Sequence, residues 1–204
     1  MQIGPRYKKA RYLGAAVFRK TQTQKYAMRS QQQVKGKTMG KRRGNKSEYG
    51  RQMLEKQKAR YSYGVSGGQF AKYVKMALQA SGDNGKNLLR LLESRLDNVV
   101  LRAGFAPSRS AARQMVSHGH ITVNGKIVTV PSYSVKVGDK LAIREGSKNK
   151  ALFAKLDEEL KNVKWPAWLS VDAAKKEVAI GGEPSAESSE LLFNVRAVLE
   201  FYTR

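Results

Sequence analysis

Residues 108–130 read SRSAARQMVSHGHITVNGKIVTV and contain two strong local signals in succession. Ser108 follows a proline and is a good N-cap, so a short helix is predicted to begin there and to end near Gly119. Asn124-Gly125 separates two β-branched runs, and this pair favours a two-residue type I′ turn because both positions require a positive φ. The segment is therefore predicted to form a helix followed by a β-hairpin.

Polar side chains lie between the apolar positions of this segment. They are Arg109, Arg113, Gln114, His118, His120 and Lys126. Cations and amide donors on a rigid helix and hairpin suit contacts with phosphates and nucleotides. The alternative is an ordinary solvated face on a small α/β unit.

Helical and extended patterns occupy most of the remaining chain. Apolar periodicity predicts helices over residues 48–61, 69–80, 87–103, 151–163 and 191–202, and it allows a short helix within residues 11–19. Strands are predicted over residues 133–137, 141–143 and 177–180, in a small antiparallel sheet with the hairpin. Trp165 and Trp168 are expected to pack in a core rather than to stack on bases.

These elements predict an α+β fold with three regions. A basic extension is predicted over residues 1–46, and an all-helical lobe over residues 47–86 that a C-terminal helix, residues 191–204, completes. A lobe with a small antiparallel sheet is predicted over residues 87–190.

The chain is strongly and unevenly basic. Its 204 residues include 39 Lys and Arg against 16 Asp and Glu, a net charge of +23. Residues 1–82 hold 20 of the basic residues and two of the acidic ones, whereas residues 83–204 hold 19 and 14. So large a positive field opposes compaction and favours an anionic partner, of which nucleic acid is the leading candidate.

The first 46 residues combine cations with scattered aromatic side chains. Tyr7, Tyr12, Phe18 and Tyr26 lie among basic residues, a combination that suits single-stranded or loop RNA because bases stack on aromatic rings. Residues 35–46 have little to bury and a high charge density, so they are predicted to be disordered alone and to order against phosphates.

Composition excludes several classes of protein. The chain has no cysteine, so neither disulfides nor thiolate zinc sites are available. No apolar run approaches the ~20 residues that cross a membrane. The N-terminal residues lack the apolar core of a signal peptide.

Motifs for phosphate-loop and metal chemistry are incomplete. Gly36-Lys37-Thr38 resembles the end of a phosphate-binding loop, but Gln31 stands where the first glycine belongs and no apolar strand precedes it. His118 and His120 form a His-x-His pair without a third histidine or a thiolate. No cofactor and no metal are therefore expected, and the two histidines are predicted to contact phosphate or 2′-OH groups.

One triplet in the sequence has a counterpart in enzymes. Arg95-Leu96-Asp97 resembles the triplet that carries the catalytic aspartate of pseudouridine synthases. Here the triplet falls within an apolar helical pattern, and the chain has no room for the large catalytic domain of such enzymes. We therefore predict an internal Arg95–Asp97 contact that orients the helix, and no catalysis.

Two longer segments resemble a known family. Residues 91–145 read LLESRLDNVVLRAGFAPSRSAARQMVSHGHITVNGKIVTVPSYSVKVGDKLAIRE, which closely resembles the RNA-binding domain of bacterial-type small-subunit ribosomal protein four. This α-L type domain also occurs in pseudouridine synthases, tyrosyl-tRNA synthetases and a small heat-shock protein. Residues 47–60, SEYGRQMLEKQKAR, with Tyr63-Gly64-Val65 and Gln69-Phe70, resemble the first lobe of the ribosomal protein itself. Residues 168–172 and 199–204 are similar to its tail.

The resemblance implies a structural constituent of the small ribosomal subunit, in the cytoplasm or in an organelle. Such a protein binds a multi-helix junction in the 5′ domain of 16S-type rRNA as a primary binder and helps to start subunit assembly. Together with the cations of the sequence, it predicts that rRNA is contacted by Arg51, Lys56, Lys58, Arg60, Arg95, Ser108, Arg109, Arg113, Gln114, His118, His120 and Lys126.

The resemblance also implies contacts beyond rRNA. Residues matching Lys41, Arg42, Arg43 and Lys46 lie, in the family, near the mRNA entry channel, where they are associated with unwinding of mRNA together with small-subunit proteins three and five. The interface with protein five is tied to decoding accuracy. Neither a membrane nor a small-molecule substrate is expected.

The sequence departs from the family near its N-terminus. Many relatives carry a cysteine cluster there that can bind zinc, and this chain has none.

Two other functions use related parts: a free RNA chaperone would share the α-L domain without needing residues 47–69, and an rRNA-modifying enzyme would need a catalytic domain.

Overall fold

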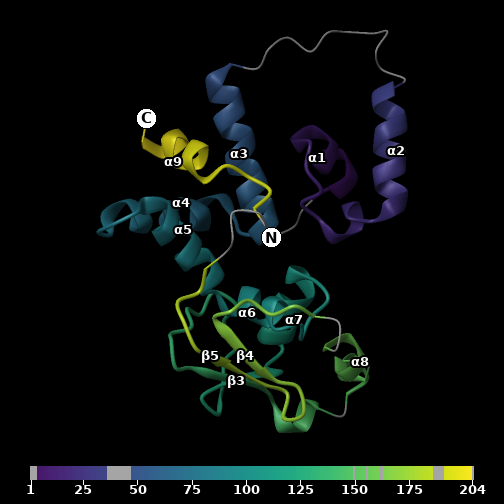
Figure 1. Cartoon of the computed structure of the whole chain (residues 1–204), viewed down its shortest axis with the longest axis vertical. Coiled ribbons are helices and arrows are strands. Elements are labelled where there is room, and N and C mark those ends of the chain that lie inside the picture. The colour runs from purple at the N-terminus through teal and green to yellow at the C-terminus, as the bar shows by residue number, and fades with distance from the viewer. Residues whose placement is uncertain are drawn as a thin grey trace. The chain divides into compact units, whose positions relative to one another are not determined.

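A computed structural model of the chain describes residues 4–35, 47–148, 150–154, 156–160, 163–185 and 191–203. The chain divides into two compact units (Figure 1). The first unit comprises Met1–Gly85 and Glu187–Arg204, and the second unit comprises Lys86–Ala186. Helices predominate in the first unit and an antiparallel sheet lies in the second, so the predicted α+β fold is confirmed.

The first unit is built around one long helix. Its described helices are α1 (Arg6–Leu13), α2 (Gln24–Lys35), α3 (Glu48–Tyr63), α4 (Gly67–Gln79) and α9 (Val195–Thr203), with a 3-10 turn η1 (Arg19–Thr21). Helix α3 contacts both α9 and α1, which lie on opposite sides of it in Figure 1. The last helix of the chain thus packs on α3 within the first unit, and it begins four residues later than the predicted start at residue 191.

Hydrogen bonds at the helix ends follow local sequence. The Ser47 hydroxyl accepts from the Gly50 amide at 3.2 Å, and the Ser66 hydroxyl accepts from the Gln69 amide at 3.3 Å. Gly64 ends α3 with a φ of 64°, a conformation that glycine adopts without steric penalty. The predicted helices over residues 48–61 and 69–80 are confirmed to within two residues at each end.

The described part of the N-terminal region belongs to the first unit. An apolar cluster of Ala10, Leu13, Val17 and Phe18 packs on Leu54 of α3. Helix α1 ends at Leu13, with Gly14 in the left-handed conformation, so the helix lies earlier than residues 11–19 allowed. Helix α2 was not predicted, and the described residues of the predicted basic extension fall in the same unit as the helical lobe.

The second unit begins with two short helices where the sequence predicted one. Instead of one helix over residues 87–103, α5 (Asn84–Glu93) and α6 (Leu96–Arg102) are separated at Ser94 and Arg95. The break gives the chain hydrogen bonds to a distant segment, because the Leu96 amide donates to Tyr133 O at 2.8 Å and the Val135 amide donates to Ser94 O at 2.8 Å. These long-range bonds outweigh the local helical preference.

A five-stranded antiparallel sheet follows helix α7 (Arg109–Ser117). Its strand order is β2-β1-β3-β5-β4, with β1 Ile121–Val123, β2 Lys126–Ile127, β3 Lys140–Ile143, β4 Leu169–Asp172 and β5 Glu177–Ile180. Asn124 and Gly125 have φ values of 50° and 78°, which confirms the predicted tight turn between β1 and β2. The strand predicted over residues 133–137 is reduced to one bridge, between Arg95 and Ser134.

One apolar core joins the sheet to α6 and α7. Leu96, Val100, Met115, Ile121 and Leu141 are among its members, each at most 3% exposed. The Ser108 hydroxyl accepts from the Ala111 amide at 3.3 Å and starts α7, as predicted.

Beyond β3, the helix predicted over residues 151–163 is short. The described residues contain 3-10 turns η2 (Glu145–Ser147) and η3 (Ala151–Phe153) and helix α8 (Leu156–Leu160). Leu152 and Leu192 are 52% and 43% exposed, whereas the neighbouring Phe153 and Phe193 are buried. Trp168 is 6% exposed and confirms the predicted packing role, whereas Trp165 is 38% exposed with its indole N–H donating to Ala103 O.

Two glycines with positive φ provide a test of packing around α6. A Cβ at Gly104 (φ +85°) would lie 2.9 Å from Val163 Cγ2, whereas a Cβ at Gly138 (φ +91°) would meet nothing within 4 Å. Gly138→Ala should therefore lower the free energy of unfolding by about 1–2 kcal/mol through backbone strain. Gly104→Ala should lower it by about 1–3 kcal/mol more through overpacking. Urea unfolding measures both, and equal losses would contradict this packing.

Candidate RNA-binding surfaces

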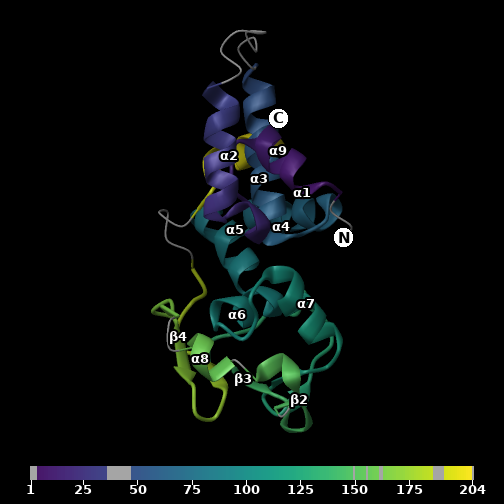
Figure 2. The same ribbon diagram turned by 90° about the vertical axis from the view of Figure 1, so that its right-hand side faces the viewer.

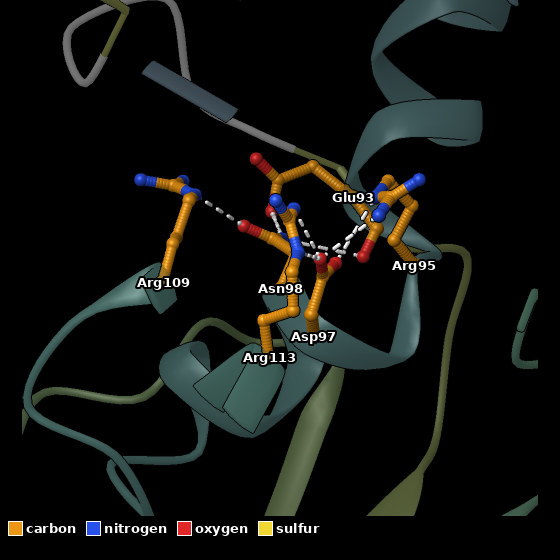
Figure 3. A network of polar contacts seen from close by, with 6 residues as sticks. All are labelled: Glu93, Arg95, Asp97, Asn98, Arg109 and Arg113. Carbon is orange, nitrogen blue, oxygen red and sulfur yellow. Dashed lines mark hydrogen bonds and ion pairs between the residues drawn. The ribbon is translucent and has the colours of Figure 1, made fainter. Parts of the chain in front are cut away.

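A buried carboxylate lies at the centre of the second unit's polar network (Figure 3). Asp97, in the first turn of α6, is 2% exposed. Its Oδ1 accepts from Arg95 Nε at 3.0 Å, and its Oδ2 accepts from Arg95 Nη2 at 2.8 Å and from Arg113 Nη2 at 2.6 Å. The predicted internal Arg95–Asp97 contact is confirmed, and the same carboxylate also fixes Arg113 of α7.

A second carboxylate extends the network to Arg109. Glu93, fully buried at the end of α5, accepts from Arg102 Nε at 3.0 Å and from Asn98 Nδ2 at 2.6 Å. The Asn98 side-chain oxygen then accepts from Arg109 Nε at 3.1 Å, a bond that Figure 3 also shows. Arg109 at the start of α7 and Arg113 in its middle are therefore fixed in position by acceptor groups on α6.

The network is electropositive despite its two carboxylates. The guanidinium groups of Arg95, Arg102 and Arg113 pair with Glu93 or Asp97. A fourth guanidinium group, that of Arg109, donates to Asn98. Buried carboxylates are stable only when paired, so the pairs fix the guanidinium positions. The Arg113 side chain is 28% exposed, so part of a positively charged group with a fixed geometry reaches the surface.

The remaining predicted residues of this lobe occupy different environments. Gln114, His118 and Lys126 are exposed, and Ser108 is half-buried as the cap of α7. Arg95, in contrast, is 4% exposed. The structure therefore gives Arg95 an internal position on Asp97, whereas the others reach the surface of α7 and the hairpin.

His120 lies at the edge of the same surface. Its Nδ1 is 2.9 Å from the Ser147 hydroxyl, and its ring meets Phe153 edge-on at a centroid distance of 6.2 Å. Burial lowers the pKa of His120 below the usual histidine value, and the positive charges of Lys150, His118 and Arg144 lower it further. Among the described residues, no group of three or more His, Asp or Glu could hold a metal ion.

Three of the four cations of α3 that were predicted to contact RNA also make contacts within the first unit. Arg51 is exposed, but Lys58 pairs with Glu55 at 2.7 Å. Lys56 Nζ lies 4.2 Å from the centroid of the Phe201 ring, and burial lowers the pKa of Lys56, with the nearby Arg60 charge adding to the effect. Arg60 lies over the Tyr61 ring at 4.6 Å. Cation–π contacts thus hold two of these side chains on their own unit.

Four predicted contact residues lie outside the described part of the chain, and three residues of the polar network were not predicted. Lys41, Arg42, Arg43 and Lys46, predicted at the mRNA entry channel, lie outside the described residues. Glu93, Asn98 and Arg102 were missed as site residues. The signal that the sequence offers for them is a set of polar residues within an apolar helical pattern. In the structure residues 92–100 are all buried.

Comparison with known proteins covers both units. The S4 domain matches residues 94–141, and the ribosomal protein S4/S9 N-terminal domain matches residues 2–93. The small ribosomal subunit protein uS4 of Chromobacterium violaceum is 41% identical over 202 residues, which span 99% of this chain and 98% of that protein. The chain belongs to the uS4 family of small ribosomal subunit proteins.

Further relatives agree with this assignment. The uS4 protein of Delftia acidovorans is 43% identical over 206 residues, covering 99% of this chain and 98% of that protein. The uS4A protein of Alkaliphilus metalliredigens is 47% identical over 165 residues, covering 81% and 79%. The family consists of structural RNA-binding proteins of the ribosome, not enzymes, which agrees with the prediction of no catalysis. No helix among the described residues is long and apolar enough to cross a membrane.

Removal of the Asp97 charge tests the network. Asp97→Asn leaves the buried Arg95 guanidinium without its counter-charge, so the free energy of unfolding should fall by about 3–5 kcal/mol. The control is Glu183→Gln, which breaks the exposed Arg90–Glu183 pair of the same unit and should change stability by less than about 1 kcal/mol. Urea unfolding of the two variants measures both values. Similar small losses would contradict a structural role for Asp97.

The lowered pKa of His120 predicts a pH dependence of stability. The neutral imidazole is favoured in the folded chain, so its contribution is complete above about pH 6.5, the pKa of an unfolded histidine, and is lost as the pH falls through the folded pKa. The urea midpoint should therefore fall less between pH 7.5 and 5.5 in His120→Gln than in the unsubstituted chain. An equal fall in the midpoint for His120→Gln and the unsubstituted chain would contradict the prediction.

Proposed function

We propose that this chain is a primary rRNA-binding protein that binds a helical junction in the 5′ domain of 16S-type rRNA. The observation that supports this most directly is the attachment of Arg109 and Arg113 to α6, through Asn98 and Asp97 at 3.1 Å and 2.6 Å. Guanidinium groups held in this way lose little side-chain entropy on binding. They suit an RNA whose phosphates already have defined positions.

The mechanism is electrostatic and geometric. Neutralising on the order of 6–10 phosphates would release counterions, so the affinity should fall steeply with salt. Base recognition is secondary, because the deep major groove of A-form RNA hides the base edges and the shallow minor groove exposes backbone and 2′-OH groups. In the second unit the RNA contacts would come from Arg109, Arg113, Gln114, His118, His120 and Lys126. Ser108 would contribute as the N-cap of α7, and Arg95 would act through Asp97.

The first unit would add a second set of contacts. Arg51 is exposed on α3. Lys56, Lys58 and Arg60 lie on the same helix and also make ion-pair or cation–π contacts within the unit. Two binding surfaces on one chain raise each other's effective concentration at an RNA that can engage both. A preference for folded RNA over an isolated duplex follows from this arrangement.

The family resemblance supports further proposals for the ribosome. The chain would help to nucleate small-subunit assembly in a ribosome of bacterial type, cytoplasmic or organellar. Its residues Lys41, Arg42, Arg43 and Lys46 would contribute to the mRNA entry channel with small-subunit proteins three and five, and the interface with protein five would influence decoding accuracy.

Sedimentation distinguishes this proposal from a free RNA chaperone. A tagged chain should be present in mature small subunits at one copy per particle. Loose association, or fewer copies than particles, would favour a chaperone or another transient binder.

Lys126→Ala tests the second unit's surface without touching the buried network. Lys126 is exposed on β2, at one edge of the sheet, and forms no ion pair among the described residues. Its loss should weaken junction-RNA binding and reduce the slope of log affinity against log salt by about one, with no change in stability. The matched control is Lys175→Ala, in the turn between β4 and β5 at the other edge, which should leave both unchanged. Equal effects of the two substitutions would overturn this assignment.

A further inference from the structure

We propose that α1 and α2 form a separate binding site for unpaired RNA nucleotides, with the stacked rings of Tyr7 and Tyr26 as the surface on which a base lies. None of the residues predicted from the family resemblance to contact rRNA lies on these helices, although the aromatic residues and cations of the first 46 residues are of the kind that suits loop RNA. The inference rests on the proposed function only in taking RNA as the partner of the chain. In Figure 1, α1 lies between α3 and α2 of the first unit, and Figure 2 shows these helices from the side of α2.

The two rings form an incomplete stack. Their centroids are 5.7 Å apart and their planes differ by 28°, so the rings lie face against face. Tyr26 also packs on the apolar cluster of the first unit, whereas Tyr7 remains 49% exposed. A ring that stacks on one side and keeps half of its surface in solvent can accept a third ring on its other side.

Cations flank the stack on both helices. Arg11 follows Tyr7 by four residues and Arg29 follows Tyr26 by three, so each cation lies on the same helix face as its tyrosine. Arg11 Nε also donates to Tyr7 O at 3.4 Å. The sequence contains no Asp or Glu before Glu48, so no carboxylate of these helices competes with a phosphate. Aromatic rings bordered by cations are the combination that binds single-stranded nucleic acid.

The surface is held in place by the fold around it. In η1 the Thr21 hydroxyl donates to Phe18 O at 2.7 Å and accepts from the Phe18 amide at 3.2 Å, which fixes the turn between the two helices. The buried side chains of Leu13 and Phe18 attach this turn to Leu54 of α3. The tyrosines therefore require little ordering when a base binds.

Unpaired nucleotides fit this surface better than a duplex. Every base has a π face, so stacking on Tyr7 tolerates any sequence, but a base in a duplex already stacks on its neighbours. The purely structural alternative is that the tyrosine stack only joins α1 to α2. That alternative predicts equal effects of a substitution on single-stranded and duplex RNA.

Fluorescence anisotropy of the intact chain separates the two interpretations. The probes are a labelled decauridylate and a labelled RNA duplex of the same length. Tyr7→Ala should weaken binding of decauridylate by about fivefold to tenfold, the lower part of the range for one base–aromatic contact. Duplex binding should change by less than about twofold, and Tyr7→Phe, which keeps the ring, should bind both probes as the unsubstituted chain does.

The matched control is another exposed tyrosine of the same unit. Tyr49 is 52% exposed and contacts Phe201 of α9, on the other side of α3 from α1, so Tyr49→Ala should leave decauridylate binding unchanged. Equal losses for Tyr7→Ala and Tyr49→Ala would overturn the proposal, as would a loss in Tyr7→Phe or equal losses for the two probes.

A measurement on the unsubstituted chain avoids dependence on how the variants fold. Decauridylate carrying one 5-iodouridine is crosslinked by ultraviolet light, and the crosslinked peptide is identified by mass spectrometry. Attachment at Tyr7 or Tyr26 supports the site, and attachment only elsewhere contradicts it. The effect of Lys126→Ala on junction RNA is independent of this result, so it shows separately whether the proposed function fails.

Discussion

The pairing of one buried carboxylate with two guanidinium groups determines how the second unit is assembled. Asp97 carries a negative charge at 2% exposure and binds Arg95 next to it in sequence and Arg113 on the following helix. A buried carboxylate without partners would be strongly destabilising, so the chain must bring α7 to α6 in this register. The requirement links a local motif to the packing of two helices.

The same requirement accounts for the interruption of the helical chain. At Ser94 and Arg95 the backbone leaves the helix, and Arg95 adopts an extended conformation with ψ of 135° as the N-cap of α6. The break lets the Leu96 and Asp97 amides donate to Tyr133 O and Pro131 O at 2.8 Å and 3.1 Å. Glu93, at the end of α5, can then bind Arg102 of α6. Charge pairing and backbone hydrogen bonding thus favour the same arrangement.

For RNA binding, the consequence is that charge and rigidity occur together. A chain with a net charge of +23 could attract RNA with flexible lysines alone. Here Arg109 and Arg113 are held by acceptors on α6, and Arg60 and Lys56 of the first unit are held against aromatic rings. Charges with fixed positions can distinguish one arrangement of phosphates from another, which suits an RNA recognised by its shape.

The parts of the fold that depend on neighbouring residues could be predicted from the sequence. Ser108 and Asn124-Gly125 set the start of α7 and the hairpin through local hydrogen bonds and backbone preference, and the Arg95–Asp97 contact followed from its apolar context. The break before α6 could not be predicted, because its hydrogen bonds join residues 34 to 41 positions apart. Helix α2 was missed because QKYAMRSQQQVK has no apolar stripe and depends on Tyr26 packing against the cluster around Phe18.

Recognition of a folded RNA by its shape, through fixed positive surfaces, is what we propose for this chain. Its most direct test compares the affinity of the intact chain, at physiological salt, for three RNAs of equal length: a multi-helix junction, a continuous duplex and an unstructured strand. Binding to the junction should be tighter than to either of the others by about tenfold or more, a difference of about 1.4 kcal/mol. Equal affinity for the three RNAs would contradict the account.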